Sequence, residues 1–381
     1  MSAILPFVRH STARFVKADS VREVVSLGLV SGKNFILFGP GGHGKSEMLD
    51  AIFSNIKDAS CKVQMFGEGM DEARLYGGIN LKKINDPDSP AIVYHPERSF
   101  LSWDYAIFEE LFDAPTMVLL SLKDTLTAAC LRNGEQQFSM QTKVIACATN
   151  REPAEVASAG TAAQALIERF PLQLRVKWDS YKSEDYRQMF NQTYVAAAST
   201  LATTITNAEL TQLRSRASSA HIPMDISNLL ASLIASLVEK GGVVAPRTAM
   251  YARDVIKASA AINNRDVVTK EDLLTIKYLP GCEEIAAGLE KELATLEIKN
   301  KALETIGKLR TIFTELQETY QSCKSPIDFL KISKKAADLA RKAAAIQVDD
   351  SLYAIREDVV TKLNLLSSQA LVAATNATKT E

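Results

Sequence analysis

Histidine and cysteine are too scarce and too scattered in this sequence to build a metal site. The 381 residues include four histidines and five cysteines, and no two cysteines stand in a Cys-x-x-Cys spacing. An odd number of dispersed cysteines also disfavours a disulfide framework. Each thiol is therefore expected to be a small buried hydrophobe in a reducing cytoplasm.

An excess of charge and a long apolar run are also missing. Lys and Arg number 44 against 45 Asp and Glu, a net charge of −1, so no overall field attracts the protein to nucleic acid or to an anionic membrane. No segment reaches about 18 uninterrupted apolar residues, and no signal-peptide pattern opens the chain. We expect a soluble, cytoplasmic protein without a membrane partner, long enough for two or three domains.

The most informative stretch is a glycine-rich loop. It follows an apolar run at residues 35–38 and precedes a helical pattern at residues 47–53, which is the context of a phosphate-binding loop. Its glycines would let successive backbone N–H groups point at an anion. Lys45 would contact the β- and γ-phosphates of ATP, and Ser46 would ligate Mg²⁺. A glycine-rich turn with an incidental lysine is the alternative. The eight residues are Gly39, Pro40, Gly41, Gly42, His43, Gly44, Lys45 and Ser46.

Two carboxylates end the next sharply defined strand pattern, at residues 104–110. These are Glu109 and Glu110, and we expect them at the carboxyl edge of the same sheet. On this interpretation Glu109 supports the Mg²⁺, and Glu110 polarises the attacking water as the general base. The alternative is a pair of solvated acids that favour a helix N-terminus.

Asn150 and Arg247 stand where a nucleotide site could use them, and Arg169 is a third polar residue to note. Asn150 follows a strand pattern at residues 143–148 and could hold the lytic water or the γ-phosphate, or could simply form a turn. Arg169 lies in a predicted helix at residues 163–170. Arg247 opens a helix directly after Pro246, where a cation is mildly unfavourable against the helix dipole. Surface solvation is the alternative for Arg247.

The pattern of elements predicts an α/β fold with three parts. Alternating strands and helices, including a helix at residues 116–131, predict a parallel-sheet domain over residues 1–179, with an inserted hairpin at about residues 79–95. Residues 180–280 read as helices only. Residues 281–381 predict a helical hairpin or bundle, and their 14 basic against 15 acidic residues from position 283 onward indicate an interaction or assembly arm rather than phosphate tracking. A bundle that only stabilises the neighbouring helical domain is the alternative. The helices expected in residues 180–280 are 184–202, 207–218, 225–240 and 246–262, with a capping motif at residues 269–272.

In their order, these residues resemble the AAA+ ATPases, and within them the MoxR family, over about residues 16–280. Residues 39–46 match Walker A, residues 95–100 resemble the segment that precedes Walker B, and residues 108–115 resemble Walker B with Glu109 in place of the usual aspartate. Residues 148–150 fit sensor 1, residues 167–170 fit the segment that bears the arginine finger, and residues 245–247 fit sensor 2.

The resemblance implies a P-loop AAA+ sheet core with an all-α lid, assembled as a ring that is usually a homo-hexamer. Arg169 would act on the neighbouring subunit's γ-phosphate, and Arg247 on the nucleotide of its own subunit. It further implies a Mg²⁺-dependent ATPase that remodels a protein client, often paired with a von Willebrand factor A domain protein. Glu109 leaves open a second hypothesis, a nucleotide-gated scaffold with slow hydrolysis. A third, the motor of a restriction-type system acting on nucleic acid, is disfavoured by the charge balance.

Overall fold

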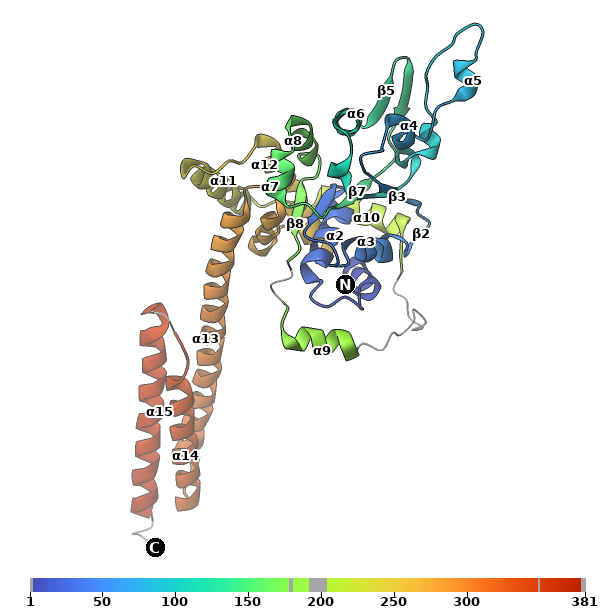
Figure 1. The fold of residues 1–381 in the computed structure, drawn as a ribbon. Coiled ribbons are helices and arrows are strands. Elements are labelled where there is room, and N and C mark those ends of the chain that lie inside the picture. The colour runs from blue at the N-terminus through green and yellow to red at the C-terminus, as the bar shows by residue number, and fades with distance from the viewer. Residues whose placement is uncertain (1–2, 178–180, 192–203, 349, 378–381) are drawn as a thin grey trace. The chain divides into compact units, whose positions relative to one another are not determined.

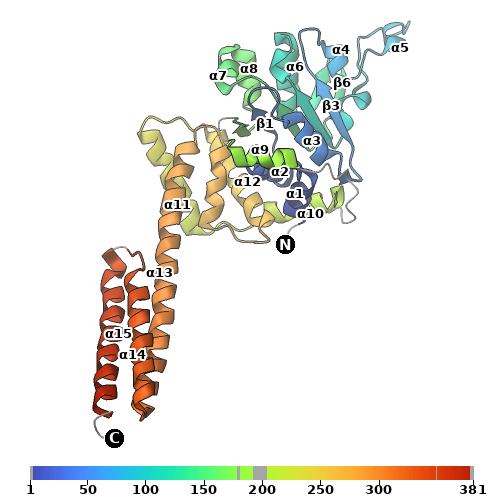
Figure 2. The ribbon, with the colours of Figure 1, turned by 60° about the horizontal axis from the view of Figure 1, so that its bottom comes forward.

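The structure is a computed structural model that describes residues 3–177, 181–191, 204–348 and 350–377. The chain folds into two compact units, Met1–Ala287 and Gly288–Glu381. Each unit has a buried hydrophobic cluster of its own. The first contains the sheet and its surrounding helices, and the second contains helices only (Figures 1 and 2).

A five-stranded parallel sheet in the order β3-β4-β7-β1-β8 forms the core of the first unit. Every residue of β1 and β7 is buried, as expected for apolar runs that are covered on both faces of a parallel sheet. The predicted α/β class is confirmed. The strands are β1 (Phe35–Phe38), β3 (Cys61–Met65), β4 (Tyr105–Glu109), β7 (Val144–Ala148) and β8 (Leu172–Arg175).

Helices pack on both faces of this sheet. On one face Phe108 belongs to the same buried cluster as Leu122 of α6 and Leu166 of α8. On the other face the ring of Phe53 in α3 lies 5.5 Å from the ring of Tyr105. The α-helices of this part are α1 (Ile4–Ser11), α2 (Asp19–Ser31), α3 (Lys45–Phe53), α4 (Glu72–Leu75), α5 (Leu81–Ile84), α6 (Thr116–Ala128), α7 (Pro153–Ser158) and α8 (Thr161–Ile167), and the short 3₁₀ turns are η1 (Pro96–Arg98), η2 (Phe100–Ser102) and η3 (Leu111–Asp113).

Residues 79–95 contain no pair of strands where a hairpin is predicted. Ile79 and Tyr94 form one isolated antiparallel bridge at the base of the insert, but α5 and irregular backbone lie between them. Asn80 caps α5 by accepting a hydrogen bond from the backbone N of Lys83, at 3.2 Å. Pro87 and Pro90 have no backbone N–H to donate to a β-ladder, and the N–H groups of Asp88 and Ser89 donate to the Asp86 carboxylate instead.

The predicted helix at residues 116–131 ends at Ala128, and the hairpin of the domain follows it. Strands β5 (Cys130–Asn133) and β6 (Gln136–Ser139) pair antiparallel, and Gly134 in their two-residue connection has a φ of 57°. Gly134 and Glu135 therefore form the hairpin turn, whereas the sequence pattern predicts a helix that continues to Leu131. The predicted helix at residues 163–170 is also shorter, since α8 ends before Arg169.

The remaining part of the first unit is mainly helical. Its predicted helices at residues 207–218, 225–240 and 246–262 are confirmed, and so is the capping box of Thr269 and Asp272. Of the predicted helix at residues 184–202, the stretch from 192 onward lies outside the described residues, as does the predicted boundary near residue 179. The elements are α9 (Ser183–Asn191), α10 (Asn207–Ser219), α11 (Met224–Glu239), α12 (Pro246–Ile262), the 3₁₀ helix η4 (Lys270–Tyr278), and the short parallel pair β2 (Ile56–Lys57) and β9 (Ile205–Thr206).

Three long helices build the second unit, in the region where the sequence predicts a helical hairpin or bundle. They are α13 (Glu283–Ser322), which begins in the first unit, α14 (Pro326–Ala344) and α15 (Asp350–Ala377). Ile306, Ala343 and Leu363 share one buried cluster, and Leu316 and Ala336 share the next one along the helices.

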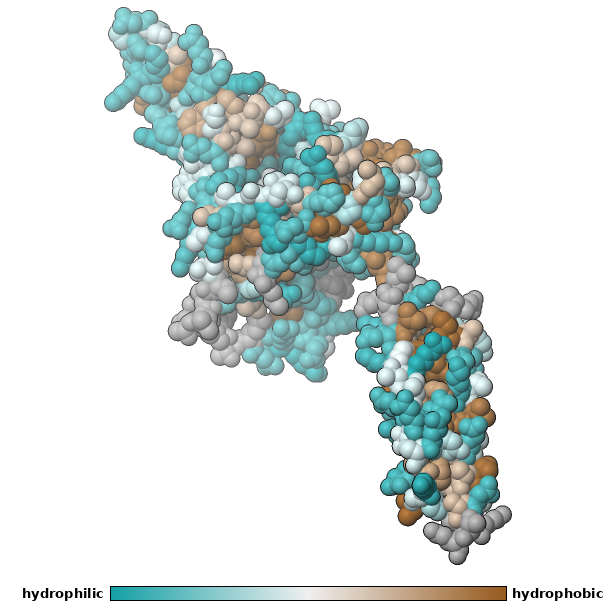
Figure 3. All heavy atoms as spheres, turned by 180° about the vertical axis from the view of Figure 1, so that it is seen from behind, coloured by the Kyte–Doolittle hydropathy of each residue, from teal (hydrophilic) through white to brown (hydrophobic). Residues whose placement is uncertain are grey.

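Within the described residues no helix is both long and apolar enough to cross a bilayer. Hydrophobic side chains stand scattered among hydrophilic ones on the face shown in Figure 3.

Candidate functional site

The glycine-rich loop connects the buried strand β1 to the first turn of α3, as the sequence predicts. Gly39, Gly42 and Gly44 have φ values of 135°, 84° and 69°, which side-chain-bearing residues rarely adopt. A Cβ atom on Gly39 would lie 2.4 Å from the carbonyl oxygen of Val176. The loop conformation therefore depends on glycine at these positions.

Lys45 is the buried cation of this loop. Its side chain reaches back over the loop and donates to the carbonyl oxygens of Gly39 (2.6 Å) and Pro40 (2.9 Å) and to Asn150 Oδ1 (3.2 Å). These contacts use the three donors of an ammonium group. Burial lowers the pKa of Lys45, and the nearby charge of Glu110 opposes that shift. If a phosphate group bound here, its charged oxygens would replace the neutral carbonyl oxygens as partners of the Lys45 ammonium group.

Glu110, Asn150 and Lys45 meet where three adjacent strands end. Glu110 Oε2 accepts a hydrogen bond from the backbone N of Asn150 at 3.0 Å, and the hydroxyl of Thr149 lies 3.4 Å from the same oxygen. The backbone N of Glu110 donates to the carbonyl of Ala148. With a φ of 53°, Glu110 has a left-handed backbone that is uncommon for a non-glycine residue and is often found at functional sites.

The two predicted metal ligands are oxygen donors on neighbouring elements. Ser46 lies in the first turn of α3, Glu109 is the last residue of β4, and both are partly buried. A hydroxyl and a carboxylate fit the preference of Mg²⁺ for hard oxygen ligands, which a bound nucleotide would supplement with phosphate oxygens. Among the described residues no group of three His, Cys, Asp or Glu side chains could hold a metal ion.

The two predicted arginines converge on one carboxylate oxygen of Glu168. Arg169 Nη1 lies 3.2 Å from Glu168 Oε2, and Arg247 Nη1 lies 3.5 Å from the same atom. Arg169 Nε also donates to Thr127 Oγ1 of α6 at 3.0 Å, which leaves its side chain only 16% exposed, whereas the Arg247 side chain is 51% exposed. Neither arginine contacts Lys45 or Glu110 in the part of the chain that the structure describes.

A cavity of ≈ 220 Å³ lies beside the phosphate loop. Its walls include Phe15, Val16, Tyr181 and Met189, together with His43 of the loop. The Tyr181 hydroxyl donates to the carbonyl of Val16 at 3.2 Å, so the N-terminal segment and the segment after the sheet are joined there. If the glycine-rich loop holds phosphates, apolar and aromatic walls beside it suit the base of a nucleotide. No sequence pattern identifies these residues, because they come from segments far apart in the chain.

Arg151 is a second feature that no sequence pattern indicates. Arg151 directly follows Asn150, and its guanidinium Nε and Nη2 atoms lie 2.8 and 2.7 Å from Asp113 Oδ1. Asp113 ends the 3₁₀ turn that follows Glu110. The ion pair therefore joins the loop that carries Asn150 to the turn that follows the predicted base.

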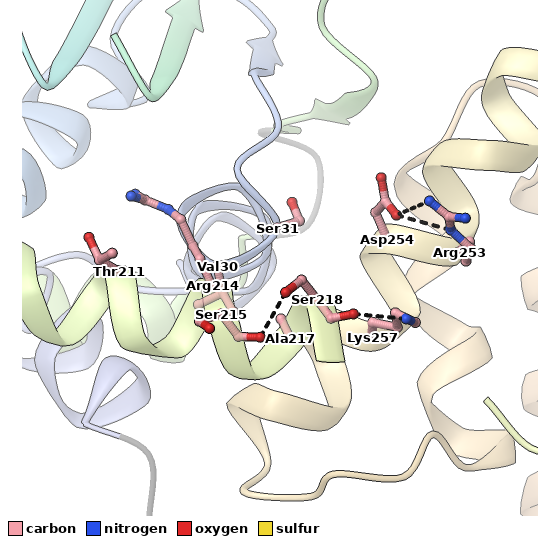
Figure 4. Close-up of a pocket in the computed structure, with 10 residues that line it drawn as sticks. All are labelled: Val30, Ser31, Thr211, Arg214, Ser215, Ala217, Ser218, Arg253, Asp254 and Lys257. Atoms are coloured by element: carbon pink, nitrogen blue, oxygen red, sulfur yellow. Dashed lines mark hydrogen bonds and ion pairs between the residues drawn. The ribbon is translucent and has the colours of Figure 1, made fainter. Parts of the chain in front are cut away.

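A larger cavity of ≈ 660 Å³ lies between α2, α10 and α12 and shares no lining residue with the phosphate loop. Its cations are engaged by protein groups (Figure 4). Arg214 turns away and donates to the Tyr105 hydroxyl at 2.9 Å, Arg253 pairs with Asp254, and Lys257 donates to the carbonyl of Ser218. We do not assign this cavity to the nucleotide.

Comparisons with known proteins identify a matching family model and a solved structure with a similar fold. The model of a family described as the MoxR domain in the MoxR-vWA-beta-propeller ternary systems matches residues 3–215. No curated protein matches the chain. Among solved structures, a candidate ATPase from Cytophaga hutchinsonii ATCC 33406 is similar with a TM-score of 0.58 and 15% sequence identity, over 76% of this chain and 93% of that one. At this identity the likeness concerns the fold.

Proposed function

This chain belongs to the MoxR family of AAA+ ATPases, since the family model matches more than half of it, and from this premise we propose that it is a Mg²⁺-dependent ATP hydrolase. We further propose that it works as a homo-hexameric ring that remodels a protein complex. The observation that carries the proposal is the meeting of a buried lysine, a carboxylate and an amide at one edge of the sheet. Lys45, Glu110 and Asn150 are joined by hydrogen bonds of 3.0 to 3.2 Å.

Each residue of the site has a proposed task. Lys45 and the backbone N–H groups of the glycine-rich loop hold the phosphates of ATP. Asn150 orients the γ-phosphate or the lytic water, and the Glu110 carboxylate takes the proton of that water as it attacks. Ser46 and Glu109 would hold Mg²⁺, which neutralises charge that develops on the phosphate oxygens.

The two arginines complete the site from different directions. Arg247 would reach the nucleotide of its own subunit, and Arg169 the γ-phosphate held by a neighbour. An arginine supplied by a second subunit can contribute on the order of 10³ to 10⁵ in rate. In this structure both arginines contact Glu168, so their engagement requires that contact to open.

The partner is proposed from the description of the matched family. Its domain occurs in systems that combine MoxR, vWA and beta-propeller proteins. We propose that a von Willebrand factor A domain protein is the adaptor or client through which ATP turnover acts.

A pair of substitutions tests the proposed ATPase. We expect Lys45→Ala to weaken ATP binding at least about 100-fold, because the phosphates lose their buried cation. Glu110→Gln should keep ATP affinity within about threefold and lower turnover about 100-fold or more, since only the proton acceptor is lost. Lys57→Ala, which removes an exposed lysine, is the control. Full turnover in Glu110→Gln would remove Glu110 from the role of base.

A nucleotide-gated scaffold is the second candidate, and the observation that favours it is Glu109 in place of aspartate. The longer carboxylate must reach the metal shell differently, which would slow hydrolysis while ATP binding persists. A scaffold would turn over ATP equally slowly whether or not a neighbour supplies Arg169.

A further inference from the structure

Helix α14 has a buried face and an exposed face with opposite chemistry. Its small and apolar residues at positions 332, 336, 340 and 343 are buried in the cores of the second unit. Residues three and four positions apart lie on the same side of a helix. This amphipathic spacing identifies the residues on the opposite side of α14, which point away from the bundle.

The exposed face is a stripe of cations with an apolar end, which we term the basic stripe. At its N-terminal end Ile327 and Leu330 are 65% and 50% exposed. All five basic side chains are exposed, and they span about 23 Å with the apolar pair at 1.5 Å per residue. The basic stripe consists of Ile327, Leu330, Lys331, Lys334, Lys335, Arg341 and Lys342.

Two of the five cations have acidic partners among the described residues. Lys331 pairs with Asp328 at 2.9 Å, and Arg341 pairs with Asp338. Lys334, Lys335 and Lys342 pair with no acid among the residues that the structure describes. Like charges at neighbouring positions on a helix face repel one another, which a partner of opposite charge would relieve.

The C-terminal region is nearly neutral as a whole, but acidic and basic residues are distributed unequally between α13 and α14. Helix α13 carries eight acidic and five basic residues, a balance of 5 − 8 = −3. Helix α14 carries five basic and two acidic residues, a balance of 5 − 2 = +3. The basic character is therefore confined to one helix, and the sum over the whole region does not reveal it.

We propose that the basic stripe docks an acidic segment of another protein, with apolar side chains that pack on Ile327 and Leu330. Apolar anchors beside complementary charges are the usual anatomy of a protein interface. A single helix face of this length matches a helical partner segment of about 15 residues. Nucleic acid or an anionic membrane fits less well, because binding to an extended array of phosphates favours a net positive charge, and the balances of α13 and α14 cancel to −3 + 3 = 0.

The test uses the full-length protein and synthetic peptides. The probe is a labelled 16-residue helical peptide with five glutamates on one face and two leucines at one end, and its matched control carries glutamine in place of glutamate. We expect the glutamate peptide to bind at least about tenfold more tightly than the glutamine peptide at low salt, with a difference that shrinks as salt rises.

Charge reversal then locates the binding surface. Lys334→Glu/Lys335→Glu/Lys342→Glu should weaken binding of the acidic peptide at least about tenfold. The matched control, Lys301→Glu/Lys308→Glu/Lys362→Glu, reverses three exposed cations outside the basic stripe and should change binding less than about twofold. Equal weakening by both triple variants would overturn the proposal. Stripe-dependent binding of a 20-base-pair DNA or of phosphatidylserine vesicles, with no stripe-dependent binding of the acidic peptide, would also overturn it.

The apolar end is tested separately. Ile327→Ser with Leu330→Ser should lower the affinity for the peptide about three- to tenfold, and should leave thermal unfolding unchanged because both side chains are already half or more exposed. Unchanged affinity would mean that Ile327 and Leu330 do not anchor the peptide.

Discussion

Glu168 lies between the two arginines on which the proposed reaction depends. A single oxygen of its carboxylate contacts both Arg169 and Arg247. In the proposed site, this carboxylate would therefore compete with nucleotide phosphates for these cations. Glu168 is itself 65% exposed, so water and salt weaken the competition.

Replacing Glu168 with glutamine should release both arginines. We expect steady-state ATP turnover to rise about two- to fivefold, the modest effect of an exposed ion pair. Glu184→Gln, which removes an exposed carboxylate that pairs with Arg187, should leave turnover unchanged. Lower turnover in Glu168→Gln would instead mean that this carboxylate helps to place an arginine for the reaction.

Two glycines of the phosphate loop offer a matched test of its backbone. Gly39→Ala places a Cβ within 2.4 Å of the Val176 carbonyl at a φ of 135°, so we expect a loss of about 2–4 kcal/mol in the free energy of unfolding. Gly41→Ala meets only ordinary contacts, at 3.6 Å from Asn150, and should change stability by less than about 0.5 kcal/mol. Urea unfolding without nucleotide measures both. Similar stability of the two variants would refute the dependence on Gly39.

At the scale of elements, Asp104 joins the amino ends of three strands to α10. Its carboxylate accepts hydrogen bonds from Ser60 before β3 (2.9 Å), Lys143 before β7 (2.8 Å) and Asn207 of α10 (2.9 Å). Burial raises the pKa of this carboxyl, but the hydrogen bonds outweigh burial and hold the pKa well below its usual range. Asp104 is thus a structural carboxylate at the edge of the sheet opposite to the phosphate loop.

The lowered pKa makes the contribution of Asp104 depend on pH. The ionised form is favoured in the folded protein, so its stabilisation is present above the ordinary aspartate pKa of about 3.9 and is lost as the pH falls through the lower, folded-state pKa. Asp104→Asn should cost about 1–3 kcal/mol at pH 7, and the deficit should narrow below about pH 4. Asp88→Asn, in an exposed loop, is the control for urea unfolding. A deficit that stays constant with pH would contradict this account.

The strands of the sheet and most helices could be predicted because their sequences carry their own signals. Apolar runs fix β1, β4 and β7 at the core, and Gly32 ends α2 with a φ of 65°. The hairpin of β5 and β6 could also have been found, because an Asn-Gly pair between short alternating runs is a hairpin signal. α1 carries apolar residues at positions 4, 7 and 8, a pattern too short to stand out.

The site was predictable as a set of residues but not as a set of contacts. Lys45, Glu110 and Asn150 each follow a strand, so the parallel sheet brings them to one edge. The contact of Arg169 with Thr127, and of both arginines with Glu168, depends on how α6, α8 and α12 pack. No local pattern in the sequence encodes that packing, and the same holds for Asp104 with Asn207, 103 positions apart.

At the scale of the whole molecule, the proposed active site belongs to two copies of the chain. In this proposal one subunit would supply Lys45, Glu110 and Asn150, and its neighbour would supply Arg169. A subunit that lacks Lys45 could still offer Arg169, and a subunit that lacks Arg169 could still bind ATP. ATP turnover should therefore be recovered only when subunits that lack Lys45 assemble with subunits that lack Arg169.

Mixing the two inactive variants tests this account most directly. Lys45→Ala and Arg169→Ala proteins should each be nearly inactive alone. Equal amounts, mixed under conditions that allow subunits to exchange, should recover about a quarter of wild-type ATP turnover, because that share of random interfaces pairs an intact pocket with an intact arginine. Turnover no greater than the sum of the separate variants at any mixing ratio would contradict a site shared between neighbouring subunits.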